Sequence, residues 1–162
     1  MTYPSDYRGG FLCGQLAFRG IPHTIDGTAV IDGYLWPPTE VGVLSEPIVL
    51  TFKAGKLIGI DGDSEKAGML ARWFEDDTAF LEHVCFGFNP VARFDGQILE
   101  AKRVFGCLNI GVGSGPRHVD GVMLNPSVYL DGVLIQEDGR FVKQELAARA
   151  DMLLRNATSD GK

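Results

Sequence analysis

Val104-Phe105-Gly106-Cys107-Leu108-Asn109-Ile110-Gly111-Val112 is an apolar run of strand length, and the glycine-rich segment Gly113-Ser114-Gly115-Pro116-Arg117-His118-Val119-Asp120-Gly121 follows it directly. We predict a buried strand over the first segment. If Val119 is extended, period-2 geometry places His118 and Asp120 on one face, where an imidazole and a carboxylate can share a metal ion. The pair alone recurs by chance, so a surface-loop histidine beside a turn aspartate is the competing interpretation.

Much of the chain's glycine falls in Asp-Gly pairs, which tolerate positive φ and make tight hairpin turns. The pairs separate short β-branched and aromatic runs, a pattern typical of antiparallel strands. We therefore predict an α+β fold, mainly antiparallel β-sheet with a central helix and a C-terminal helix. The pairs are Asp26-Gly27, Asp32-Gly33, Asp61-Gly62, Asp95-Gly96, Asp120-Gly121, Asp131-Gly132 and Asp138-Gly139.

Two hairpins stand out. Residues 47–60 alternate between faces and turn at Ala54-Gly55, and residues 127–136 turn at an Asp-Gly pair. Residues 9–18 and 28–36 are predicted as further strands, and we expect them to share one continuous sheet with the first hairpin.

Two helices are expected. The central one begins near Asp63 or Ser64, either of which can cap it, and runs to about Asp76. The terminal helix runs from about Lys143 to Arg155, and a frayed polar tail follows. The apolar stripe of the central helix is Ala67, Leu70, Ala71, Trp73 and Phe74.

Composition narrows the class of protein. A chain of 162 residues is about one domain long, so residues 1–162 are expected to form a single metal-binding, catalytic-type domain. The net charge of −6 argues against nucleic acid as a partner. No apolar run approaches the roughly 20 residues of a membrane helix, so we expect no membrane partner and a cytoplasmic location. Cys13, Cys85 and Cys107 suit buried thiols in a reducing compartment.

His83 is the candidate third ligand. Strict alternation over residues 81–90 would place His83 and Cys85 on one face and Glu82 on the other. His83, His118 and Asp120 supply two imidazoles and a carboxylate, the set that binds ferrous iron facially and leaves positions open for oxygen and substrate. Unrelated surface or core histidines are the alternative.

Other polar residues leave several roles open. Glu100 and His23 are candidate catalytic residues that would manage protons. Glu100 is otherwise a metal ligand, a partner of a ligating imidazole or an exposed carboxylate at a strand end. His23 is otherwise a loop histidine or a residue that contacts the substrate. Arg93 and Arg117 would bind a substrate carboxylate or are simply solvated. Asn109 is a polar residue in an apolar run, and a buried amide needs a hydrogen-bond partner.

Five segments occur in a particular order along residues 14–142: Gly14-Gln15-Leu16-Ala17-Phe18, Asp26-Gly27-Thr28-Ala29-Val30-Ile31-Asp32-Gly33, Gly87-Phe88-Asn89-Pro90, Leu99-Glu100-Ala101-Lys102-Arg103-Val104-Phe105-Gly106 and His118-Val119-Asp120-Gly121. Together they resemble the C-terminal metal-binding domain of the aminopeptidase T (leucyl aminopeptidase) metallopeptidases. The similar domain of the 2,5-dihydroxypyridine dioxygenases, ferrous enzymes that open a pyridine ring, resembles them too. The resemblance implies that the N-terminal domain of those relatives is missing here, and it implies a homo-oligomer.

The departures from the peptidase pattern favour the dioxygenase branch. The resemblance places Gln15 and His83 where the peptidases have glutamates, and Asn109 where they have a histidine, while Glu100, His118 and Asp120 are retained. Neutral amides at two positions would weaken or abolish one of two metal sites. What remains is His83, His118 and Asp120.

Three functions follow as hypotheses. The first is a mononuclear non-haem metal enzyme, with Fe(II) as its cofactor and a small aromatic compound as its substrate. The second is a metallo-aminopeptidase that uses Zn, Mn or Co to cleave short peptides. The third is a non-catalytic remnant of the family that binds a small ligand or a partner chain.

Overall fold

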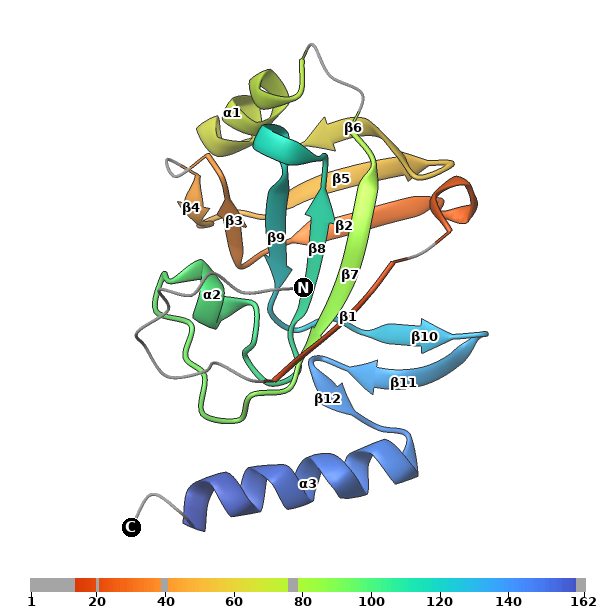
Figure 1. Cartoon of the computed structure of the whole chain (residues 1–162), viewed down its shortest axis with the longest axis vertical. Coiled ribbons are helices and arrows are strands. Elements are labelled where there is room, and N and C mark those ends of the chain that lie inside the picture. The colour runs from red at the N-terminus through yellow and green to blue at the C-terminus, as the bar shows by residue number, and fades with distance from the viewer. Residues whose placement is uncertain (1–13, 20, 39–40, 76–78, 160–162) are drawn as a thin grey trace.

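The computed structural model describes residues 14–19, 21–38, 41–75 and 79–159, which form three β-sheets and several helices (Figure 1). The largest sheet has six strands in the order β1-β7-β8-β9-β3-β4. All strand pairings within the described sheets are antiparallel. The strands of the largest sheet are β1 (Gln15–Phe18), β3 (Tyr34–Trp36), β4 (Gly42–Val43), β7 (Leu81–Gly87), β8 (Leu108–Val112) and β9 (Val119–Met123).

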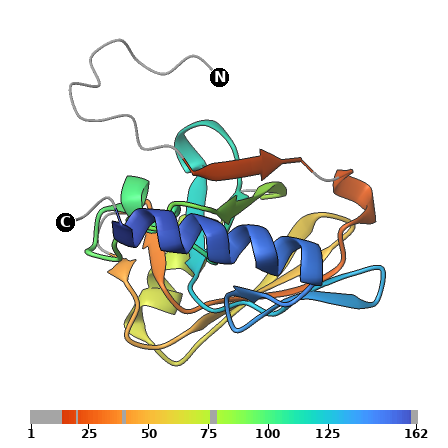
Figure 2. The ribbon, with the colours of Figure 1, turned by 90° about the horizontal axis from the view of Figure 1, so that it is seen from below.

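Within the described residues, two smaller sheets and three α-helices accompany the largest sheet, which confirms the predicted α+β class. Figure 2 shows the C-terminal helix α3 lying across the outside of the body. One small sheet contains β2 (Gly27–Ile31), β5 (Ile48–Lys53) and β6 (Lys56–Asp61), and the other contains β10 (Val128–Leu130), β11 (Val133–Glu137) and β12 (Arg140–Phe141). The helices are α1 (Glu65–Trp73), α2 (Ile98–Ala101) and α3 (Gln144–Ser159), with short 3-10 helices η1 (Pro22–Thr24) and η2 (Gly115–Arg117).

The main core lies between the β2-β5-β6 sheet, α1 and one face of β8 and β9. Leu50 of β5, Leu70 of α1 and Ile110 of β8 are all nearly inaccessible and belong to one cluster. Burying each such side chain contributes about 1.5–3 kcal/mol. In Figure 1 the strands of the β2-β5-β6 sheet run across β7, β8 and β9. The opposite face of β8 and β9 carries Asn109 and Asp120 beside a smaller buried cluster that contains Val122.

Register decides which residues occupy that opposite face. Ile110 pairs with Gly121 across β8 and β9, and the next pair along the strands is Gly111 with Asp120. Because successive side chains in a strand alternate between faces, Asp120 faces away from the cluster that contains Ile110. The hydrophobic core therefore fixes the orientation of Asp120.

Both predicted hairpins are confirmed. Ala54 and Gly55 have φ of 50° and 77° between β5 and β6, and Asp131 and Gly132 have φ of 51° and 78° between β10 and β11. Two consecutive positive φ values suit the right-handed twist of the flanking strands, which explains these short turns. Asp120-Gly121, in contrast, makes no turn, because both residues are paired with β8 inside β9. The glycine instead lets the backbone pack close to Ile31.

The expectation of one continuous sheet is wrong. The strand expected over residues 28–36 breaks at Asp32-Gly33 into β2 and β3, which belong to different sheets. Asp32 Oδ1 accepts a hydrogen bond from the backbone N–H of Leu124 at 2.8 Å, which ties this break to the end of β9. Part of the strand expected over residues 9–18 lies outside the described residues, and β1 covers the rest.

The central helix begins where predicted and ends earlier. Ser64 caps α1 by accepting from the Ala67 N–H, and the helix ends at Trp73. Asp76, the expected end, lies outside the described residues, and Ala71 of the expected apolar stripe is exposed. At the C-terminus, Asn156 belongs to α3, so the helix extends into the tail that was expected to fray. No helix in the described parts of the chain is long and apolar enough to span a membrane.

Candidate metal centre

Three neighbouring strands align the candidate ligands in one row across the sheet. His83 of β7 pairs with Gly111 of β8, and Gly111 pairs with Asp120 of β9. Side chains in such a row share a face, and adjacent strands are about 4.8 Å apart. His83 and Asp120 therefore stand on either side of Gly111 and lean over it toward one another.

Gly111 provides the room in which the two imidazoles meet. A Cβ at this position would lie 2.1 Å from His83 Cε1 and 2.6 Å from His118 Cε1. Both distances are too short for any side chain, so only glycine fits here. The two rings stack with their centroids 5.3 Å apart. His118 reaches this place from the segment between η2 and β9. The approach of this ring to the His83 ring of β7 therefore depends on the glycine in β8.

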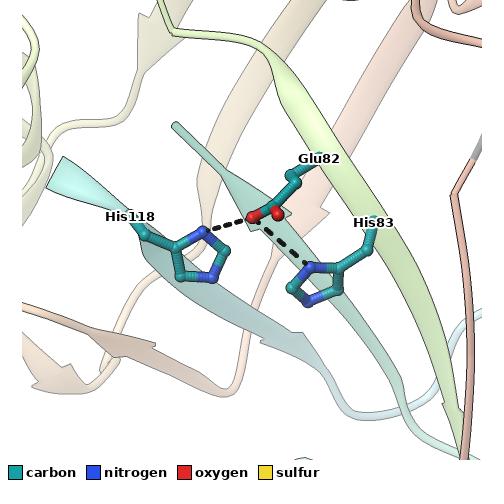
Figure 3. A group of neighbouring side chains, drawn as sticks. All are labelled: Glu82, His83 and His118. Carbon is teal, nitrogen blue, oxygen red and sulfur yellow. Dashed lines mark ion pairs between the residues drawn. The ribbon is translucent and has the colours of Figure 1, made fainter. Parts of the chain in front are cut away.

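Glu82 joins the two histidines, contrary to the expected alternation. The register of β7 against β8 shifts between Leu81 and His83, and this β-bulge turns Glu82 toward the site. Glu82 Oε2 lies 2.9 Å from His118 Nδ1 and 3.9 Å from His83 Nδ1 (Figure 3). Potential ligand atoms of Glu82, His83 and His118 lie within 4.8 Å of one another, as a metal site requires.

Asp120 faces the other nitrogen of each ring. Its Oδ1 lies 3.2 Å from His83 Nε2 and 3.5 Å from His118 Nε2. This oxygen is buried, and no atom of the described residues is a partner with the geometry of a hydrogen bond. Lys102 Nζ lies 3.2 Å from the second carboxylate oxygen, Oδ2. Each ring thus has a carboxylate near both of its nitrogens.

The charges at the site stabilise one another. Burial would raise the pKa of Asp120, but His118, His83 and Lys102 outweigh it and hold that pKa well below its usual range. Asp120 in turn raises the pKa of His118, and it raises the pKa of His83 to about 10, with Cys85 as the next cause. Without a metal, protons on the histidines therefore neutralise the carboxylate, and a divalent cation would have to displace them.

The other predicted site residues lie elsewhere. His23 is exposed in η1. Glu100 lies in helix α2 and not at a strand end, and its Oε1 accepts a hydrogen bond from the backbone N–H of Arg93 at 2.8 Å. Neither residue belongs to the metal-binding group found among the described residues. Their predicted catalytic roles stay predictions.

Asn109 lies one row from the histidines on the same face of β8. It pairs with Cys85 and Val122 and is completely buried. Its Nδ2 donates to the carbonyl of Gly121 at 3.3 Å, whereas Oδ1 has no partner. The expected hydrogen-bond partner therefore exists for the donor half of the amide only.

Three residues of the site escaped the sequence argument: Glu82, Lys102 and Gly111. Glu82 precedes His83 directly, but the alternation rule assigned it to the far face. Lys102 follows α2 and reaches Asp120 from 18 positions away. Neither a bulge nor such a long-range ion pair leaves a local pattern in the sequence.

Comparison with known proteins supports the fold. No protein-family model matches the chain, and no curated protein matches it. A solved structure, the 2,5-dihydroxypyridine dioxygenase from Pseudomonas putida KT2440, superposes on 81% of this chain with a TM-score of 0.66 and 21% sequence identity. The match spans 44% of that enzyme's chain, less than half its length. The chain therefore has a dioxygenase-like fold together with a possible His/Glu metal site, whereas the resemblance to aminopeptidase T gains no support.

Proposed function

We propose that this protein is a mononuclear, metal-dependent enzyme that uses Fe(II) and acts on a small aromatic compound. The observation that carries the proposal is the convergence of two imidazoles and two carboxylates over Gly111. Two features fit a cation: the buried Asp120 Oδ1, which has no hydrogen-bond partner among the described residues, and the missing Cβ at Gly111, which lets both imidazoles approach that oxygen. The dioxygenase-like fold supports the choice of reaction.

His83 Nε2, His118 Nε2 and Asp120 Oδ1 are the proposed ligands. The Asp120 side chain is 8% exposed and its Oδ1 contacts both Nε2 atoms, whereas Glu82 is 34% exposed and its Oε1 is already paired with Arg19 at 2.9 Å. In this assignment Glu82 accepts the Nδ1–H of His118 and fixes the tautomer that leaves Nε2 free. Two histidines and one carboxylate on one face suit ferrous iron.

When bound, the iron would supply Lewis acidity and one-electron oxygen chemistry. The chain's own residues would hold the metal and orient its ligands. Glu82 keeps the His118 ring in place, and the Lys102 ammonium offsets part of the negative charge of Asp120. The strand row keeps His83 and Asp120 at a fixed separation, so the ligand geometry is built before a metal arrives.

Metal content after anaerobic Fe(II) loading tests this proposal. We expect about one equivalent in the native protein and a near-complete loss in His83→Ala, His118→Ala and Asp120→Asn. His23→Ala is the matched histidine control and should retain the metal. Less than about a tenth of an equivalent in the native protein would refute the site. Oxygen uptake with 2,5-dihydroxypyridine and other dihydroxylated rings then tests the reaction.

A metallo-aminopeptidase of the aminopeptidase T type is the second candidate. Asn109 Oδ1, which has no hydrogen-bond partner among the described residues, and the second carboxylate, Glu82, favour it, because both place additional oxygen atoms near the site. Against it, Lys102 Nζ lies 3.2 Å from Asp120 Oδ2, where a second divalent cation would be repelled. It predicts release of free amino acids from short peptides and stronger metal binding in Asn109→His.

We further propose that residues 1–162 act as one domain and that the protein is a homo-oligomer. The resemblance noted in the sequence is the support for the oligomer. Light scattering coupled to size-exclusion chromatography of the full chain measures its mass directly, and a mass of one chain at micromolar concentration would contradict the proposal.

A further inference from the structure

A cavity of about 280 Å³ opens beside His83. Its lining combines apolar side chains, among them Phe18 and Leu99, with three cationic ones, Arg19, Lys102 and Arg103. Ligand sites in proteins commonly measure about 300–1,000 Å³, so this one suits a compound with a single ring. Because His83 is part of the wall, such a compound would lie against the proposed metal site.

The charge of this cavity is opposite to that of the whole molecule. The chain carries a net charge of −6, yet the described residues that line the cavity include no aspartate or glutamate. Two of the three cations have acidic partners nearby: Arg19 pairs with Glu82, and Lys102 pairs with Asp120. The third cation, Arg103, differs from them.

Arg103 is a buried guanidinium that has no counter-ion in the described part of the chain. It is 5% exposed, its Nη1 donates to the carbonyl of Leu99, and its Nε has no hydrogen-bond partner among the same residues. Within the described residues no carboxylate forms an ion pair with it, although fully buried arginines are rare unless they are paired. Arginine stays protonated in proteins, so the missing partner is an anion.

We infer that this cavity binds the carboxylate of a small aromatic acid, with Arg103 as its counter-ion. A guanidinium binds a planar carboxylate through two parallel hydrogen bonds, and the apolar wall accepts the ring. The inference rests on the proposed function and narrows its substrate to hydroxylated aromatic carboxylic acids. The sequence had offered Arg93 and Arg117 as carboxylate-binding residues, with simple solvation as the alternative. Arg93 is exposed, and Arg117 Nη1 donates to the carbonyl of Trp73 at 3.0 Å.

Calorimetric titration of the full chain with benzoate, benzamide and benzylamine tests the charge preference. The metal is first removed with a chelator, so binding to iron plays no part, and the failure of the metal proposal would leave this test intact. We expect benzoate to bind about tenfold or more tightly than its neutral isostere benzamide or the cationic benzylamine. Equal binding of benzoate and benzamide, or no binding of benzoate at about 10 mM, would overturn the inference.

Arg103→Met identifies the counter-ion, because methionine keeps an unbranched apolar side chain but lacks the guanidinium. Benzoate affinity should fall at least about tenfold, while Arg72→Met, on the exposed side of α1, should leave it unchanged. Retained affinity in a folded Arg103→Met protein would overturn the assignment. If circular dichroism shows that this variant is unfolded, Arg103→Lys replaces it, with weaker benzoate binding expected because the bidentate contact is lost. Unchanged affinity in Arg103→Lys would count against the inference.

Discussion

Glu82 is the most informative single residue, because its role distinguishes two possible sets of metal ligands. In the proposed assignment it accepts the Nδ1–H of His118, and the metal is bound by the Nε2 atoms and Asp120. In the alternative, Glu82 is itself a ligand together with the Nδ1 atoms. The two assignments use the same rings and differ in which carboxylate and which ring nitrogens contact the ion.

Glu82→Gln is the first prediction. The amide keeps the shape but is a poorer acceptor, so we expect metal affinity to fall by about 10–100-fold with one equivalent still bound at saturation. Competition with a chromophoric chelator measures the affinity. Glu46→Gln, in an exposed loop, is the control and should bind as the native protein does. Complete loss of the metal in Glu82→Gln would instead make Glu82 a ligand.

The pH dependence of stability is the second prediction. The pKa of His83 is raised from 6.5 to about 10 in the metal-free fold, so the folded state holds its proton more tightly than the unfolded chain. The resulting stability is fully present below about pH 6.5 and is lost as the pH rises through 10. Urea unfolding of metal-free protein between pH 6 and 10 should therefore show a falling free energy of unfolding.

The same titration has an internal control. His83→Gln removes the titrating group, so its unfolding free energy should depend less on pH over this window. A native protein and a His83→Gln variant with parallel pH profiles would contradict the raised pKa. Metal-loaded protein should also lack this particular loss, because a coordinated imidazole does not take up a proton.

Period-2 geometry predicted that His118 and Asp120 share a face, whereas His83 was added as a histidine on another candidate strand and from the family resemblance. The alternation rule misplaced Glu82 because one bulge in β7 breaks that period. Lys102 was missed for a different reason. Its contact with Asp120 links the end of α2 to β9, and nothing in the local pattern of residues 98–102 indicates that pairing.

At the level of elements, hairpins were predictable and sheets were not. The turns at Ala54-Gly55 and Asp131-Gly132 are set by their own positive φ values, which a local sequence pattern reveals. The separation of β2 from β3 depends on which distant strands each one pairs with: β2 with β5, and β3 with β9. Such long-range pairing is decided by packing of the whole core, which the sequence pattern does not contain.

In strand β8 a single residue, Gly111, determines whether ligands from the neighbouring strands can meet. Gly111→Ala is therefore the third prediction. The added Cβ would lie 2.1 Å from His83 Cε1, so the rings must move apart and the ligand atoms no longer converge. We expect metal affinity to fall at least about tenfold, measured by chelator competition. Gly59→Ala in β6 is the matched control, because its Cβ would meet Thr51 at an ordinary 3.5 Å. Equal metal binding in Gly111→Ala and Gly59→Ala would refute the role of the glycine.

At the scale of the whole molecule, a bound metal would link the three central strands of the largest sheet. His83, Gly111 and Asp120 come from β7, β8 and β9, and the other face of β8 and β9 carries the main hydrophobic core. Unfolding the core therefore destroys the site, and a ligand that binds only the folded site must stabilise the entire fold.

Thermal unfolding with and without metal is the fourth prediction. At a free metal concentration of about 100 times Kd, binding adds about 2.7 kcal/mol to the free energy of unfolding, which corresponds to a rise of roughly 5–10 °C in Tm for a chain of this size. Anaerobic scanning calorimetry with Fe(II), repeated after addition of a chelator, measures the shift and its reversal. Asp120→Asn should show no shift, whereas Asp95→Asn, an exposed aspartate in the loop before α2, should behave as the native protein does. An identical Tm for native protein in Fe(II) and in chelator would support the non-catalytic alternative, because a fold that gains nothing from the metal has no functional centre at Gly111.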